Sequence, residues 1–174
     1  IRRIDHEHNG ELTKNLKAHS QVVYQQDSAY MLTDILKGTL TESYGTGYGL
    51  ALENDMPAAG KTGTTNSSKD TWFCGYTRYY TTAIWVGYDT PRAMPGIYGK
   101  TYAGKIWKQV MDQIHEGKEP LDWEQPATVE MTTDSKSGIT DLFSATLHER
   151  AEQSLHDKEQ RKLEEDLETA VTAF

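Results

Sequence analysis

Residues 60–65, Gly-Lys-Thr-Gly-Thr-Thr, form the run that is densest in functional groups in this sequence of 174 residues. Lys61 can supply a fixed positive charge, and the threonine hydroxyls can both donate and accept hydrogen bonds. Two different chemistries fit such a run. It can be a phosphate-binding loop of a nucleotide-binding protein, or a strand whose edge binds an extended peptide.

A phosphate-binding loop needs a further glycine five positions before the glycine of Gly-Lys-[Ser/Thr], and a helix directly after the motif. Asp55 holds that position here, and its carboxylate would repel a phosphate group. The polar run after Thr65, followed by strand-like residues, is a poor start for a helix. Nucleotide binding is therefore the least favoured hypothesis for this motif. If it were correct, bound ATP or GTP would protect Lys61 from chemical modification.

The strand interpretation lets a peptide add to the motif through main-chain hydrogen bonds. Gly60 and Gly63 would weaken an ordinary strand, so they fit best where a ligand backbone approaches closely. Thr62 and Thr64 would then bind a terminal carboxylate beside Lys61, and the backbone N–H of Thr64 is a candidate oxyanion donor. For the isolated motif, a surface turn rich in Gly and Thr remains an alternative.

The elements that position the motif can be predicted from the residues around it. Helical spacing of apolar residues predicts a helix that Asp27 caps and that continues to Leu40. Glycines at 45, 47 and 49 then indicate a flexible or close-approach loop. β-Branched and aromatic residues predict three consecutive antiparallel strands, at 59–65, 71–76 and 82–88.

In the second and third predicted strands, both alternating sets of side chains are apolar or aromatic, so we expect helices on both faces of the sheet. One such helix is predicted at residues 102–115 from a single apolar stripe. The tryptophans and tyrosines of these strands are expected in the core, and Cys74 is expected to be a small buried hydrophobe.

The two ends of the chain have a different character. Residues 1–12 predict a hairpin around Asn9-Gly10, a dipeptide that tolerates a tight turn. We divide the chain into a domain at 1–129, a linker at 130–141, and an acidic, helical tail at 142–174. From Leu147 to the end the tail carries eight acidic and four basic residues, which is typical of a solvated or partner-binding helix.

Longer runs around the motif resemble the transpeptidase domain of class A penicillin-binding proteins. The matching runs are 45–47, 59–66, 70–77, 84–89 and 103–108. Such enzymes carry three signatures, Ser-x-x-Lys, Ser-x-Asn and Lys-Thr-Gly. The resemblance covers about residues 1–129. It implies an α/β fold of the α+β type, an antiparallel sheet flanked by helices that is the C-terminal portion of a β-lactamase/transpeptidase-like fold.

By this resemblance the chain is part of a peptidoglycan D,D-transpeptidase, a serine-type enzyme that cross-links D-Ala-D-Ala stem peptides and is acylated by β-lactams. Lys61 and Thr64 would be catalytic, and Thr62, Gly63, Thr64 and Thr65 would bind substrate. The resemblance also implies roles in cell-wall synthesis, cell shape and antibiotic resistance. It places the protein at the extracytoplasmic face of the bacterial cytoplasmic membrane.

The departures from the family pattern are equally specific. No serine in the sequence is followed three residues later by lysine, and no Ser-x-Asn occurs. We therefore expect the chain alone to be inactive, to be a fragment, and to need the missing N-terminal part of the domain, with membrane attachment only through an absent N-terminal anchor. The alternative is a noncatalytic binding or interaction module derived from this fold, with the acidic tail as its contact surface.

Composition excludes several other classes. A net charge of −8 argues against nucleic-acid binding, which needs clustered Lys and Arg. No apolar run is long enough to span a membrane, and one cysteine cannot form an internal disulfide. Asp5-His6-Glu7-His8 flanks a predicted turn, so we interpret it as solvated polar residues rather than a metal site. No metal or cofactor is expected.

Overall fold

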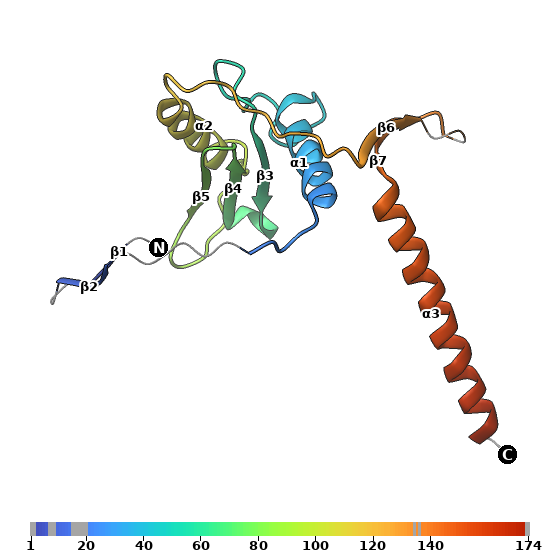
Figure 1. Ribbon diagram of the computed structural model, residues 1–174. Helices are drawn as coiled ribbons and strands as arrows, with labels where there is room; N and C mark the ends of the chain where they lie inside the picture. Colours follow the sequence, from blue (N-terminus) through green and yellow to red (C-terminus); the bar gives the residue numbers. More distant parts are fainter. Residues whose placement is uncertain (1–2, 7–9, 15–20, 134, 136, 173–174) are drawn as a thin grey trace.

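The fold is described from a computed structural model, which describes residues 3–6, 10–14, 21–133, 135 and 137–172 (Figure 1). The helices and strands, in chain order, are β1 (Arg3–His6), β2 (Gly10–Lys14), α1 (Gln26–Thr41), β3 (Ala59–Thr64), a short 3-10 helix (Asn66–Ser68), β4 (Asp70–Tyr76), β5 (Thr81–Gly87), α2 (Ala103–Ile114), β6 (Val129–Thr133), β7 (Thr140–Ser144) and α3 (Ala145–Thr172).

The central sheet has the strand order β3-β4-β5, and both pairs are antiparallel, as the sequence predicted. Lys61 of β3 lies opposite Cys74 of β4, and Phe73 of β4 lies opposite Ile84 of β5. Each predicted strand agrees with the observed one to within one residue at either end. Short connections between neighbouring antiparallel strands explain this agreement, because such pairing depends on nearby residues.

One face of this sheet, which we call the Phe73 face, packs into the core. Helices α1 and α2 both contribute to it: Leu40 comes from α1, and Trp107 and Met111 from α2. The rings of Phe73 and Trp107 lie 4.7 Å apart between centroids, and both side chains are fully buried. Because aromatic side chains bury large apolar areas, this pair joins α2 firmly to the sheet.

The opposite face of the sheet, the Trp72 face, is open among the described residues. Trp72 and Trp85 are 43% and 41% exposed, and their ring centroids lie 6.3 Å apart. Cys74, two residues after Trp72 on the same face, is also exposed. The described part of the chain therefore places no helix on this second face, in contrast to the expectation of helices on both faces, and the expectation that Cys74 is buried was wrong. An alternating apolar pattern shows that a strand can be covered on both sides, but it does not show what covers it.

Asp27 does not cap its own helix, in contrast to the prediction. Helix α1 begins at Gln26, with Gln25 in the cap position and no side-chain cap hydrogen bond. The Asp27 carboxylate instead accepts hydrogen bonds from the hydroxyls of Thr128 and Ser144. The residue that the local sequence marked as a helix cap thus makes contacts with residues more than 100 positions away.

The flanking segments also form regular structure. Strands β1 and β2 pair antiparallel, as the predicted hairpin requires. Of the predicted turn, Asn9 lies outside the described residues and Gly10 is the first residue of β2. Residues 130–141, expected to be a linker, contribute most of the hairpin β6–β7, and α3 follows as a single helix of 28 residues (Figure 1). No helix in the described part of the chain is long and apolar enough to cross a membrane.

Candidate functional site

The Lys-Thr-Gly-Thr motif lies on β3, which is an edge strand of the described three-stranded sheet. After the strand, the chain makes a short 3-10 turn and enters β4 rather than a long helix. The phosphate-loop interpretation is therefore wrong, because that loop must wrap a phosphate and lead into a helix. An edge strand instead offers unpaired main-chain groups to a partner.

Lys61 holds its ammonium group close to the strand edge. Its Nζ donates hydrogen bonds to the carbonyl oxygen of Thr62 at 3.1 Å, to the hydroxyl of Thr62 at 3.3 Å and to the hydroxyl of Thr46 at 3.3 Å. No carboxylate of the described residues lies within ion-pair distance of this nitrogen. The positive charge is thus oriented by neutral oxygens and is not neutralised by a neighbouring side chain.

Thr62 and Thr64 lie on the side of β3 opposite to Lys61 and Gly63. Register places Thr62 opposite Phe73, so both threonines belong to the Phe73 face, whereas Lys61 belongs to the Trp72 face. The Lys61 side chain reaches Thr62 because the strand is at the edge of the sheet. The hydroxyl of Thr64 accepts a hydrogen bond of 3.1 Å from the backbone N–H of Gly99.

The backbone N–H of Thr64 points away from β4. The N–H of Thr65 donates to the carbonyl of Asp70 at 3.0 Å, which makes Thr65 and Asp70 a hydrogen-bonded pair of the ladder. In an antiparallel pair, adjacent residues alternate between bonding the neighbouring strand and facing the other way. The N–H groups of Thr62 and Thr64 therefore face the open edge, where a ligand can accept from them.

Thr65 and the two glycines have more local roles than the sequence indicated. The hydroxyl of Thr65 accepts the N–H of Asp70 at 2.9 Å and so closes the turn between β3 and β4. A Cβ on Gly60 would lie 2.9 Å from the ring of Phe73, so packing against this ring requires a glycine here. At Gly63 a Cβ would lie 3.3 Å from the Cβ of Trp72, a tighter contact than usual but a milder one than at Gly60.

A hollow of about 420 Å³ lies beside Lys61, between α1, the loop that follows it, β3 and β7. Its lining residues include Ile35 and Thr39 of α1, Thr46 of the loop, and Asp141 of β7. A space of this size is within the range of small-ligand sites. Lys61 therefore borders a hollow on the α1 side of the strand.

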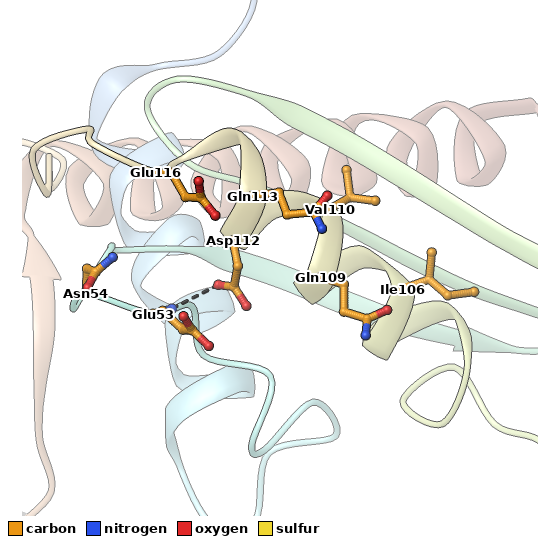
Figure 2. Close-up of a pocket in the computed structure, with 8 residues that line it drawn as sticks. All are labelled: Glu53, Asn54, Ile106, Gln109, Val110, Asp112, Gln113 and Glu116. Carbon is orange, nitrogen blue, oxygen red and sulfur yellow. Dashed lines mark hydrogen bonds between the residues drawn. The ribbon is translucent and has the colours of Figure 1, made fainter.

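A second hollow, of about 460 Å³, is lined by other residues than those of the motif (Figure 2). It lies between α2 and the turn at Glu53, and the backbone N–H of Glu53 donates to Asp112 at 2.9 Å within it. Lys108 pairs with the same carboxylate at 2.7 Å. None of the predicted site residues lines this hollow, so we assign it no role in the chemistry.

Sequence reasoning missed three contacts that shape the site. Thr46 contacts Lys61, the Thr39 hydroxyl donates to the carbonyl of Gly60, and Gly99 donates to Thr64. The only signal for the first contact was the Gly45-Thr46-Gly47 run, which indicated close approach without naming a partner. Contacts between residues 15 to 35 positions apart depend on packing that the local sequence does not encode.

Comparison with known proteins identifies this arrangement. The family model for the penicillin binding protein transpeptidase domain matches residues 2–112. Penicillin-binding protein 1A of Clostridium acetobutylicum is 40% identical over 113 residues, which cover 65% of this chain and 14% of that protein. Penicillin-binding protein 1A of Clostridium tetani is 37% identical over 132 residues, which cover 73% of this chain and 16% of that protein.

The fold agrees with these matches. The crystal structure of penicillin-binding protein 1A from Haemophilus influenzae superimposes with a TM-score of 0.65 at 22% identity, over 78% of this chain and 24% of that one. The chain thus spans only a small part of the length of the relatives it matches. It belongs to the penicillin-binding protein transpeptidase family and is homologous to the transpeptidase domain of the class A protein 1A.

Proposed function

We propose that this chain supplies the substrate-binding strand of a serine-type peptidoglycan D,D-transpeptidase, which cross-links D-Ala-D-Ala stem peptides and is acylated by β-lactams. The observation that carries the proposal is the edge position of β3, where the ammonium group of Lys61 lies 3.3 Å from the hydroxyl of Thr62. An extended peptide can pair with such an edge through main-chain hydrogen bonds.

The proposed roles follow from what each group can offer. Lys61 attracts the substrate carboxylate and assists proton transfer, because no described carboxylate competes for its charge. The outward N–H of Thr64 donates to the oxyanion that forms when the acyl carbon is attacked. Thr62 and Gly63 contact the bound peptide, and Thr65 holds the turn that ends the strand.

The nucleophile must come from outside this sequence, since the sequence has no Ser-x-x-Lys motif. We propose that it lies in an N-terminal part of the same domain, and that the chain alone is inactive. The open Trp72 face supports this proposal, as does a stripe of half-exposed apolar residues on α2 (Ile106, Val110 and Ile114). Apolar surfaces of this kind are normally covered by a partner.

Attachment to the extracytoplasmic face of the bacterial cytoplasmic membrane, through an anchor outside this chain, is part of the same proposal. So are the roles in cell-wall synthesis, cell shape and antibiotic resistance, because all of them depend on the activity of the complete protein. The substrate and the inhibitor share one chemistry, an acyl group next to a carboxylate. Both would therefore use the same edge of β3.

Labelled penicillin tests the proposal in the complete protein that contains this chain. Intact-mass measurement and peptide mapping should find one covalent adduct, on a serine outside residues 1–174, and the isolated chain should form none. Lys61→Ala should slow adduct formation strongly, whereas Lys162→Ala, a change of an exposed tail lysine, should not. A complete protein that forms no adduct, or an adduct on a serine within this chain, would refute the proposal.

A further inference from the structure

We infer that Thr46 is a positioning residue for Lys61, an inference that rests on the proposed function of the β3 edge. Of the described residues outside β3, Thr46 is the one whose side chain accepts a hydrogen bond from the Lys61 ammonium group, at 3.3 Å. The other acceptors of that group, the carbonyl and hydroxyl of Thr62, belong to the next residue of the same strand. They lie on the strand that carries Lys61, whereas Thr46 ties the ammonium group to a separate segment, the loop after α1.

The loop that carries Thr46 is fixed to the end of α1. The N–H of Gly47 donates to the carbonyl of Thr39 at 2.9 Å, and the N–H of Gly49 donates to the carbonyl of Leu40 at 3.3 Å. These amides satisfy carbonyls that the last turn of a helix leaves without partners. A Cβ on Gly45 would collide with the carbonyl of Thr39, and one on Gly47 would lie 3.0 Å from the side chain of Leu40. Glycine on both sides of Thr46 therefore allows the loop to lie directly on the helix.

The end of α1 is in turn fixed to β3. The hydroxyl of Thr39 donates to the carbonyl of Gly60, one residue before Lys61. Helix, loop and strand are thus joined in a closed circuit: Thr39 binds the strand through its side chain and the loop through its carbonyl, and Thr46 binds Lys61. The circuit sets the position of the Thr46 hydroxyl relative to the strand, so the hydroxyl can hold the ammonium group over the strand edge.

Holding the lysine matters because a long lysine side chain loses rotamer entropy when it is fixed. If part of this ordering is already present in the free protein, less of it remains to be lost when substrate binds. Thr46 would therefore act on substrate only through Lys61. Removing its hydroxyl should slow acylation without changing the fold, and the effect should depend on the presence of Lys61.

A double-mutant cycle in the complete protein tests this dependence. The probe is labelled penicillin, and adduct formation is followed for hours by intact-mass spectrometry so that slow variants can be measured. Thr46→Val keeps the shape but removes the hydroxyl, Thr46→Ser keeps the hydroxyl, and Lys61→Ala removes the ammonium group. Thr41→Val is the matched control, because Thr41 is an exposed threonine near the end of α1 whose hydroxyl, among the described residues, donates to the Lys37 carbonyl and does not contact Lys61.

We expect Thr46→Val to slow acylation by about 3- to 10-fold, the effect of one hydrogen bond. Thr46→Ser and Thr41→Val should react at close to the normal rate, with unchanged melting temperatures. In the Lys61→Ala background, Thr46→Val should have no further effect. If Lys61→Ala forms no adduct at all, the two Thr46 variants are compared in the protein that keeps Lys61. A normal acylation rate in Thr46→Ser and a reduced rate in Thr46→Val, at equal melting temperatures, would then support the role of the hydroxyl.

Two results would overturn the inference: an unchanged rate in Thr46→Val, or the same slowing by Thr46→Val with and without Lys61. The second result would show that Thr46 acts through the fold of the loop. Failure of the proposed function gives a different pattern, because the unsubstituted complete protein would then form no penicillin adduct.

Discussion

The hydroxyl of Ser144 donates a hydrogen bond to the carboxylate of Asp27, which lies 117 residues earlier in the sequence. Thr128 donates to the other carboxylate oxygen at 2.8 Å, and the Ser144 oxygen accepts the N–H of Leu147 at 3.3 Å. Asp27 is buried at the start of α1, and Ser144 is the last residue of β7, directly before α3. One carboxylate therefore joins the first turn of α1 to the segment from which the C-terminal helix begins.

Replacing Asp27 with asparagine should loosen this junction. The amide keeps one oxygen acceptor. Its NH₂ group, however, faces one of the two hydroxyls that donate to the carboxylate in the unsubstituted protein, so a buried hydrogen bond is lost. Amide hydrogen exchange should become faster in β7 and in the first turn of α3, while exchange in β4 stays unchanged. Equal protection in both proteins would show that the hairpin is held by other contacts.

The same junction should depend on pH. Hydrogen bonds from Ser144 and Thr128, followed by the positive charge of Arg150, lower the pKa of Asp27 below its ordinary value of 3.8. A carboxyl group whose pKa is lowered by folding stabilises the folded state above the ordinary pKa, and this contribution is lost as the pH falls through the folded value. Protection of β7 should therefore be constant near neutral pH and decrease in acid. Asp27→Asn should lack this decrease, and a decrease of the same size in that variant would assign it to other groups.

Gly75 of β4 should not tolerate a side chain. A Cβ at this position would lie 2.5 Å from the Trp107 ring and 3.0 Å from the Phe73 ring, both of which are fully buried. Overpacking of this kind costs about 1–3 kcal/mol, so Gly75→Ala should lower the free energy of unfolding in urea by that amount. Gly38→Ala is the control, because Gly38 lies inside α1 with its nearest Cβ contact at 3.6 Å, and alanine there should stabilise the helix by about 1 kcal/mol. Equal effects of the two changes would contradict the packing described for Trp107.

Cys74 offers a direct test of the open sheet face. It is the single cysteine of the sequence and is exposed on the Trp72 face. A maleimide reagent should label it in the isolated chain without denaturant, and Cys74→Ser should abolish labelling. In the complete protein the missing part of the domain should cover this face and slow labelling at least about tenfold, because a buried thiol is inert. Rapid labelling in the complete protein would show that this face is open there as well.

Much of this fold could be predicted from the sequence because its signals are local. Apolar spacing between Met31 and Leu40 indicated α1, and aromatic and β-branched residues indicated β3, β4 and β5 with nearly correct bounds. The motif at Lys61 was placed on a strand because Asp55 and the residues after Thr65 did not suit a phosphate loop. Helical and strand periodicity follow from backbone geometry, so a few neighbouring residues are enough to show them.

The sequence by itself thus determined helices α1 and α2, strands β3 to β5 with their order in the sheet, and the family to which the Lys-Thr-Gly-Thr strand belongs. Only the tertiary structure decided that Trp72 and Cys74 face outward while Phe73 faces the core, that Asp27 binds Ser144 instead of capping its helix, and that Thr46 meets Lys61. The physical reason is that each of these outcomes depends on which elements pack against each other. The type of a residue and its position in the sequence indicate what its side chain can bind. Which partner it does bind is decided only when distant segments pack together.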